Sequence, residues 1–322
     1  MHKIIRKKHK IYELKFLSFL FFYFILFLIS CHIFNIKKTK YNKTQNSSSI
    51  SFKNADNKHK IIAISYGNKL FKRQLKANKK SALEIGNVDE YYNYGPDDID
   101  KDFKEKNKDI LSIKRGNGLW LWKPYFINKT IIEKMEDGDY LIYTDAAVMF
   151  MNSSQLLIDF LKLNNADMWM FRLTYKESKY SKRDAFILIG VDMPFYSETN
   201  QYQAGIQIYR KNAYTIRFVQ EWLFYCKDKR IVSDNNNTLG KNNYPGFIEN
   251  RHDQTALSLL IKKYGEVNSG KPNFSLNKLN QEKIKIMPII FCIYRKMHFK
   301  DYYDLKSKCS KLIELQKKFY SY

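Results

Sequence analysis

The sequence has few cysteines, and their spacing argues against two kinds of site. Only four of the 322 residues are cysteine, Cys31, Cys226, Cys292 and Cys309, and no two form a CxxC pair. A zinc site or a thioredoxin-type dithiol is therefore not expected. Because Cys31 lies in an apolar N-terminal segment, the other three allow at most one disulfide and leave a free thiol.

Acidic residues are also scarce. The chain has 32 Asp and Glu against 56 Lys and Arg, which gives a formal net charge of +24. Such an excess can indicate nucleic acid, an anionic membrane surface or acidic substrates. Lysine is spread through nearly every segment, and RNA-binding and zinc-finger patterns are absent. The excess therefore reflects either biased composition or a basic face that attracts an anionic ligand, and we do not expect a nucleic-acid partner.

Residues 16–36 contain no formal charge at all. A helix of about 20 such residues crosses the hydrocarbon core of a bilayer. Basic residues are concentrated in the short tail 1–15, so the positive-inside rule predicts a single-pass anchor with a cytoplasmic N-terminus. The main domain would then lie outside the cytoplasm, in the ER or Golgi lumen of a eukaryote or the cell envelope of a bacterium.

Processing of this segment offers two alternatives to an uncleaved anchor. No A-x-A-like signal-cleavage site is present, but Leu28–Cys31 is similar to a bacterial lipoprotein box, in which Cys31 would carry lipid. Each alternative still routes the protein to a membrane system. Residues 37–57 are polar and are predicted to form a flexible stem. The main domain is therefore expected over residues 58–322.

The main domain has the pattern of an α/β protein. The apolar run 60–65 predicts a buried parallel strand, and the basic stretch 71–85 predicts a helix after it. Ligands of open α/β sheets bind outside the carboxyl ends of the strands. Ser65 and Tyr66 are therefore candidates for contacting a nucleotide.

A second strand, 140–143, leads to the most informative carboxylate. Asp145 follows this strand and is itself followed by Ala146 and Ala147, which leave room for close access. This position suits a metal or ribose ligand. The alternative is that Asp145 caps a following helix.

The segment 115–125 combines glycines with aromatic residues. Trp120 fits a core position, whereas Trp122 is a candidate for binding a ligand. Lys123 precedes Pro124 at the mouth of the predicted turn, where its charge could neutralise a diphosphate.

Four further residues are candidates for binding the ligand or a metal ion. Arg183 and Asp184 either begin a surface helix or contact a sugar. Gly205 lies in a predicted strand where a ligand could approach closely. His298 is either structural or a metal ligand.

Asp253 and Gln254 fall in the first turn of a predicted helix that continues through 256–264. The helix dipole favours an anion there, although Asp253 could instead serve as a helix cap.

Taken in order, five segments resemble those of GT-A glycosyltransferases of the nucleotide-diphospho-sugar transferase superfamily. The segments are WLWKPY at 120–125, YTDAA at 143–147, KRD at 182–184, QAG at 203–205 and HDQ at 252–254. The resemblance spans roughly residues 58–300. It implies a Rossmann-like, mixed but mostly parallel sheet flanked by helices, and the activity of a hexosyltransferase. Together with the anchor predicted at 16–36, this describes a membrane-anchored enzyme.

The resemblance also implies partners. These are a nucleotide-sugar donor, a glycan, lipid or protein acceptor, and Mn²⁺ or Mg²⁺. The family's Asp-x-Asp element corresponds to 144–147, where only Asp145 is acidic, so metal dependence stays open. Asp253 and Gln254 are the predicted catalytic residues, because they are similar to an Asp-Gln pair near the donor sugar of retaining members. Asp253 would assist acceptor deprotonation or stabilise the sugar, and the match does not assign stereochemistry. A catalytically inactive sugar-binding protein of this fold and a surface lipoprotein are the alternatives.

Overall fold

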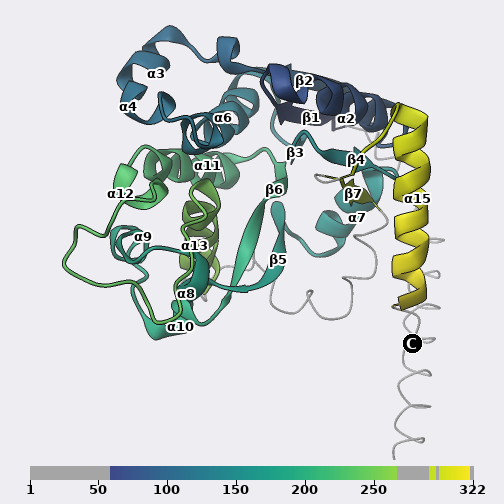
Figure 1. Cartoon of the computed structure of the whole chain (residues 1–322). Helices are drawn as coiled ribbons and strands as arrows, with labels where there is room; N and C mark the ends of the chain where they lie inside the picture. Colours follow the sequence, from purple (N-terminus) through teal and green to yellow (C-terminus); the bar gives the residue numbers. More distant parts are fainter. Residues whose placement is uncertain (1–58, 267–289, 295–296, 320–322) are drawn as a thin grey trace, which may run out of the picture. The chain divides into compact units, whose positions relative to one another are not determined.

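The computed structural model divides the chain into two units, Met1–Asn57 and Lys58–Tyr322. It describes residues 59–266, 290–294 and 297–319, all in the second unit (Figure 1). The predicted anchor 16–36, the stem 37–57 and Cys31 lie outside these residues. None of the described helices is both long and apolar enough to cross a membrane.

A five-stranded mixed sheet organises the second unit. Its order is β2-β1-β3-β6-β5. β1 pairs in parallel with both β2 and β3, whereas β6 is antiparallel to its neighbours β3 and β5. Four strands therefore run one way and β6 runs the other, as the predicted mixed and mostly parallel sheet requires. The strands are β1 (Ile61–Tyr66), β2 (Glu90–Tyr94), β3 (Tyr140–Thr144), β5 (Met168–Lys176) and β6 (Asn200–Arg210).

The central strands β1 and β3 are buried at every residue. A strand covered on both faces loses the alternation of polar and apolar residues and becomes a continuous apolar run, and this made both strands visible in the sequence. Helix α2 (Lys72–Glu84) packs on β1 and β2, α13 (Asp253–Glu266) packs on β6, and α11 (Ala213–Cys226) packs on α13 and on α6 (Trp122–Lys134).

Shorter elements complete the described unit. They are η1 (Lys69–Phe71), η2 (Pro96–Asp98), α3 (Lys101–Lys106), α4 (Lys108–Leu111), α5 (Gly116–Leu119), α7 (Gln155–Leu163), α8 (Glu177–Tyr180), α9 (Arg183–Ile189), α10 (Pro194–Ser197) and α12 (Lys229–Val232).

The C-terminal part is held by a second, smaller sheet. β4 (Val148–Phe150) pairs antiparallel with β7 (Phe291–Ile293), and α15 (Tyr302–Phe319) follows. A disulfide joins Cys292 in β7 to Cys309 in α15, and Cys226 is a buried free thiol. The described residues therefore contain one disulfide and one free thiol, which is the most that the three cysteines outside the N-terminal segment allow.

The structure decides two alternatives that the sequence left open. β3 is followed by a turn and then by β4, and the next helix, α7, begins only at Gln155. The alternative that Asp145 caps a helix is therefore wrong. Arg183 does begin a helix, α9, which is the structural alternative for that segment.

Candidate functional site

Three charged side chains from different elements meet near the carboxyl end of β3. Lys123, in the first turn of α6, places Nζ 3.5 Å from Oδ1 of Asp145 and 3.0 Å from Oδ2 of Asp253. Asp145 follows β3 and Asp253 begins α13. The side chains of Lys123 and Asp253 are only 4% and 5% exposed, whereas that of Asp145 is 22% exposed. Lys123 thus links an accessible carboxylate to a buried one.

Burial dominates the electrostatics of Asp253. Removing a carboxylate from water disfavours its charged form, and this raises the pKa of Asp253 to about 6 even though Lys123 lowers it. Its proton equilibrium therefore lies near physiological pH, which is unusual for an aspartate.

Tyr143 is a member of this cluster that the sequence analysis did not select. Its hydroxyl donates a hydrogen bond of 2.8 Å to Oδ1 of Asp145, and its ring centroid lies 5.4 Å from Nζ of Lys123. Side chains two residues apart in an extended chain point to the same side. This two-residue spacing could have identified Tyr143 from the sequence, because it places the Tyr143 side chain on the same side as Asp145.

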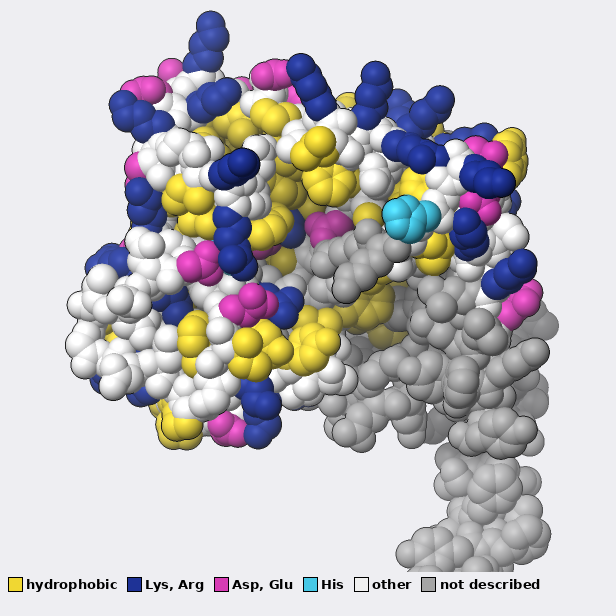
Figure 2. All heavy atoms as spheres, viewed as in Figure 1, with side chains coloured by type: hydrophobic (Ala, Val, Ile, Leu, Met, Phe, Trp, Pro, Cys, Tyr) yellow, Lys and Arg dark blue, Asp and Glu magenta, His cyan; other side chains and the backbone are white. Residues whose placement is uncertain are grey.

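A cavity of about 700 Å³ opens at Asp145. Tyr66 and Trp122 form an aromatic stack in its wall, with ring centroids 3.7 Å apart and planes inclined by 17°. Figure 2 shows a hollow near the middle of this face, where an acidic side chain lies among hydrophobic ones. Other lining residues include Leu70, Phe71, Asn117, Trp120, Ala146, Ala147, Tyr294, Met297 and Phe299.

One wall of the cavity has an unusual backbone. All five residues from Gly116 to Trp120 have positive φ, including Leu119 at 51° and Trp120 at 60°. This conformation costs roughly 1–2 kcal/mol for each residue that carries a Cβ. Such strain persists only where surrounding contacts enforce it, and it is concentrated at functional sites.

Hydrogen bonds hold this left-handed turn against the aromatic stack. The indole Nε1 of Trp122 donates to the Gly116 carbonyl oxygen at 2.9 Å, and the Asn117 amide donates to the Tyr66 hydroxyl. The same residues therefore shape the cavity wall and fix the ring positions.

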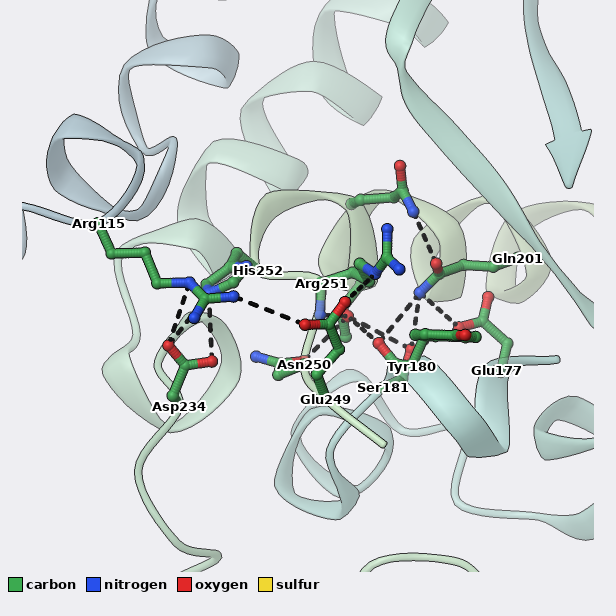
Figure 3. A network of polar contacts seen from close by, with 12 residues as sticks. Arg115, Glu177, Tyr180, Ser181, Gln201, Asp234, Glu249, Asn250, Arg251 and His252 are labelled. Atoms are coloured by element: carbon green, nitrogen blue, oxygen red, sulfur yellow. Dashed lines mark hydrogen bonds and ion pairs between the residues drawn. The ribbon is translucent and has the colours of Figure 1, made fainter. Parts of the chain in front are cut away.

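A polar network ties the turn to the segment before α13 (Figure 3). Arg115 lies 3.4 Å from Asp234 and 3.7 Å from Glu249, and His252 lies 3.3 Å from Asp234. The His252 ring also packs on Trp120, with centroids 4.8 Å apart. Burial lowers the pKa of His252, so its ring is neutral at physiological pH.

Of the predicted site residues, Tyr66, Trp122 and Asp145 line the cavity, and Lys123 and Asp253 join it through ion pairs. Asp253 itself is not among the lining residues. Ser65 and Gly205 are buried beside the site, and the Gly205 carbonyl accepts a 2.8 Å hydrogen bond from the Asp145 amide.

The remaining predicted residues have other partners. Arg183 pairs with Asp192 at 2.5 Å. Asp184 is fully buried and accepts hydrogen bonds from the backbone amides of residues 238 and 239. Gln254 bridges to β6, because its Oε1 accepts from the Ala204 amide at 3.1 Å and its Nε2 donates to Gln201. These contacts stabilise the loop after α12 and the packing of α13 on β6.

The described residues do not form a protein-made metal site. They contain no group of three or more His, Cys, Asp and Glu side chains suited to a metal ion. Asp145 is already engaged by Lys123 and Tyr143, and His298 is exposed. The described side chains alone therefore do not supply a complete set of ligands for a divalent cation.

No protein-family model and no curated protein matches the sequence. Among solved structures, the chain is similar to the bifunctional glycosyltransferase WbbM (TM-score 0.37, 11% identity, 63% of this chain and 37% of that chain). It is similar to the galactosyltransferase LgtC, in complex with donor and acceptor sugar analogs (TM-score 0.40, 12% identity, 79% and 95%). It is also similar to mouse xyloside xylosyltransferase 1 (TM-score 0.34, 9% identity, 65% and 83%). The aligned part spans little more than a third of WbbM, and these values do not assign the chain to a family.

Proposed function

We propose that the protein is a glycosyltransferase that moves a sugar from a nucleotide-diphosphate sugar to a glycan, lipid or protein acceptor. The observation that carries this proposal is the cavity in which the accessible Asp145, held by Lys123 and Tyr143, lies beside the Tyr66–Trp122 stack. Aromatic faces bind bases and sugar rings, and a carboxylate accepts hydrogen bonds from sugar hydroxyls. The volume suits a small organic ligand.

The chemistry follows from the charges. In transfer, the bond between the anomeric carbon and the diphosphate oxygen breaks, and its electron pair leaves with the diphosphate. The acceptor oxygen bonds to the anomeric carbon, and its proton passes to the departing diphosphate. Positive charge develops on the sugar, and a fixed carboxylate such as Asp145 stabilises it.

Asp253 acts in this proposal through Lys123. Because its carboxylate is nearly inaccessible and pairs with Lys123 at 3.0 Å, it is a positioning residue. It keeps Nζ of Lys123 aimed at Asp145. Binding of the donor diphosphate by Lys123 stays a prediction. The use of Mn²⁺ or Mg²⁺ also stays a prediction, and the donor diphosphate would supply most of the ligands of such a cation.

A catalytically inactive sugar-binding protein is the second candidate. The observation in its favour is that only one of the two carboxylates, Asp145, lines the cavity. Binding of a nucleotide sugar without hydrolysis or transfer, in the presence of varied acceptors and divalent cations, would support this candidate.

The test starts with a panel of nucleotide sugars, titrated into the full-length protein by calorimetry with and without Mn²⁺. Asp145→Asn should weaken binding of the selected donor by roughly 10–100-fold, because hydrogen bonds to a charged group contribute about 1.5–3 kcal/mol. Asp102→Asn, which changes an exposed carboxylate on α3, is the matched control and should bind as the unmodified protein does. Equal affinity of both variants would contradict the assignment of the cavity.

A further inference from the structure

Exposed basic side chains form a stripe along α2. Lys72, Lys76 and Lys79 are all exposed and follow the spacing of one helix face, and Lys69 precedes them in η1. From Lys72 to Leu83 this face extends about 16 Å at the helical rise. Figure 2 shows Lys and Arg side chains gathered at the top of the molecule, over the region of α2.

These lysines have little negative charge near them. The segment 67–84 contains one acidic residue, Glu84. Its Oε1 lies 3.8 Å from Nζ of Lys80, which is not one of these four lysines. Among the described residues, no ion pair involves Lys69, Lys72, Lys76 or Lys79. Their charge is therefore available to a partner, unlike that of Lys123.

Apolar side chains are exposed at the same place. Leu70 is 83% and Phe71 is 44% exposed, and both precede the first lysine of α2. An open groove of about 710 Å³ runs alongside. Its lining includes these four lysines together with Lys80 and one acidic residue, Glu84. Free lysines together with exposed Leu and Phe are typical of segments that lie in the interface of an anionic bilayer. A soluble polyanion would gain nothing from the two apolar side chains.

We propose that η1 and α2 dock on the surface of an anionic lipid bilayer, with Leu70 and Phe71 inserted and the four lysines at the headgroups. Leu70 and Phe71 also line the cavity at Asp145. Docking therefore places the mouth of that cavity next to the bilayer, within reach of an acceptor carried on a lipid. The docking surface itself is independent of whether the protein transfers sugar.

The test uses full-length protein with nanodiscs of phosphatidylcholine, alone or mixed with phosphatidylglycerol. The photoreactive residue benzoylphenylalanine replaces Leu70. In the control protein it replaces Leu163, which is 83% exposed, as Leu70 is. Lipid adducts, measured by mass spectrometry, should form at position 70 in the anionic discs and be several-fold fewer in the neutral discs. Position 163 should give background yield in both.

Charge reversal provides the second arm. K72E/K76E/K79E should reduce the adducts at position 70 to background, since each lysine near an anionic surface contributes about fivefold in affinity. K101E/K104E/K106E makes the same charge change on α3 and should leave them unchanged. If the reversal variant fails to fold by circular dichroism, K72Q/K76Q/K79Q replaces it. Two results would overturn the proposal: equal adduct yields at positions 70 and 163, or yields at position 70 that do not depend on phosphatidylglycerol. It would also be overturned if position 70 gave no lipid adducts while the lysines bound soluble polyphosphate.

Discussion

At the scale of single residues, the hydroxyl of Tyr143 gives the sharpest test of the site. Tyr143→Phe removes its hydrogen bond to Asp145 and leaves the buried ring in place. We expect a loss of roughly tenfold or more in kcat/KM for the donor, because the bond is made to a carboxylate. Steady-state kinetics with the donor identified by calorimetry would measure this loss.

Tyr209→Phe is the matched control. Tyr209 is equally buried in the same sheet, and its hydroxyl donates to Gln207 at 2.5 Å. It should alter stability by a similar amount and leave kinetics unchanged. Equal kinetic losses in the two variants would show that Tyr143 acts on the fold and not on Asp145.

The raised pKa of Asp253 predicts a pH dependence. Above a pH of about 6 the carboxylate is ionised and holds Lys123, and below it protonation weakens the ion pair. The rate should therefore fall as the pH falls through about 6, which gives an acidic limb in the pH–rate profile. The Asp253→Asn variant should be slow at every pH and should lack this acidic limb. An unchanged limb in that variant would exclude Asp253 as its origin.

The same shift has a consequence for stability, with the sign opposite to that of most aspartates. Between pH 3.8 and about 6 the folded protein binds more protons at Asp253 than the unfolded chain does. The contribution of this group to the free energy of unfolding therefore decreases as the pH rises through that window.

The sequence indicated which residues lie at the site better than it indicated which residues they contact. Asp145 could be recognised because a strand ends just before it and small residues follow. Gln254 was expected at the sugar, but the structure engages it with Ala204 and Gln201 of β6. A position in a helix's first turn identifies a residue's neighbourhood, whereas the direction of its side chain depends on strands far away in the chain.

At the scale of elements, the left-handed turn 116–120 depends on its glycines. Gly118 has a φ of 96°, and a Cβ there would lie 2.9 Å from the Cα of Leu111. Gly118→Ala therefore meets both a strained backbone and a backbone clash. We expect the free energy of unfolding to fall by about 2–4 kcal/mol in denaturant titrations, with weaker donor binding because the turn lines the cavity.

Gly240→Ala isolates the cost of the backbone conformation. Its φ is 74°, but no atom lies within 4 Å of the added Cβ. This variant should lose only about 1 kcal/mol and retain donor affinity. Comparable losses in the two variants would mean that the contact with Leu111 relaxes at no cost.

Secondary structure was predictable where burial leaves a simple pattern. The apolar runs at 60–65 and 140–143 appear as β1 and β3 because both faces of these strands are covered. The direction of β6 was not predictable in the same way, because its residues are equally buried in either orientation. In the structure β6 runs antiparallel to both of its neighbours, β3 and β5.

At the scale of the whole molecule, the disulfide connects the C-terminal helix to the site. Cys292 and Cys309 are separated by 17 residues, and the loop that they close contains the cavity-lining Tyr294, Met297 and Phe299. A loop of this length contributes roughly 3 kcal/mol of stability. Reduction should therefore lower both the melting temperature and the affinity for the donor.

The double variant Cys292→Ser with Cys309→Ser controls for other effects of the reductant. It should melt at the lower temperature with or without dithiothreitol and show the weaker affinity in both conditions. Reduction could instead lower the melting temperature and leave the donor affinity constant. That result would show that the cavity-lining residues between Cys292 and Cys309 keep their positions without the disulfide.

The position of β6 also affects how the chain is made. β6 fills the place between β3 and β5, yet it is the last of the five strands to leave the ribosome. Until it arrives, the nascent polypeptide carries β3 with one unpaired edge and a continuous apolar sequence, a combination that favours association with other chains. Productive folding of this protein thus depends on residues 200–210 being delivered before a neighbouring chain occupies that edge.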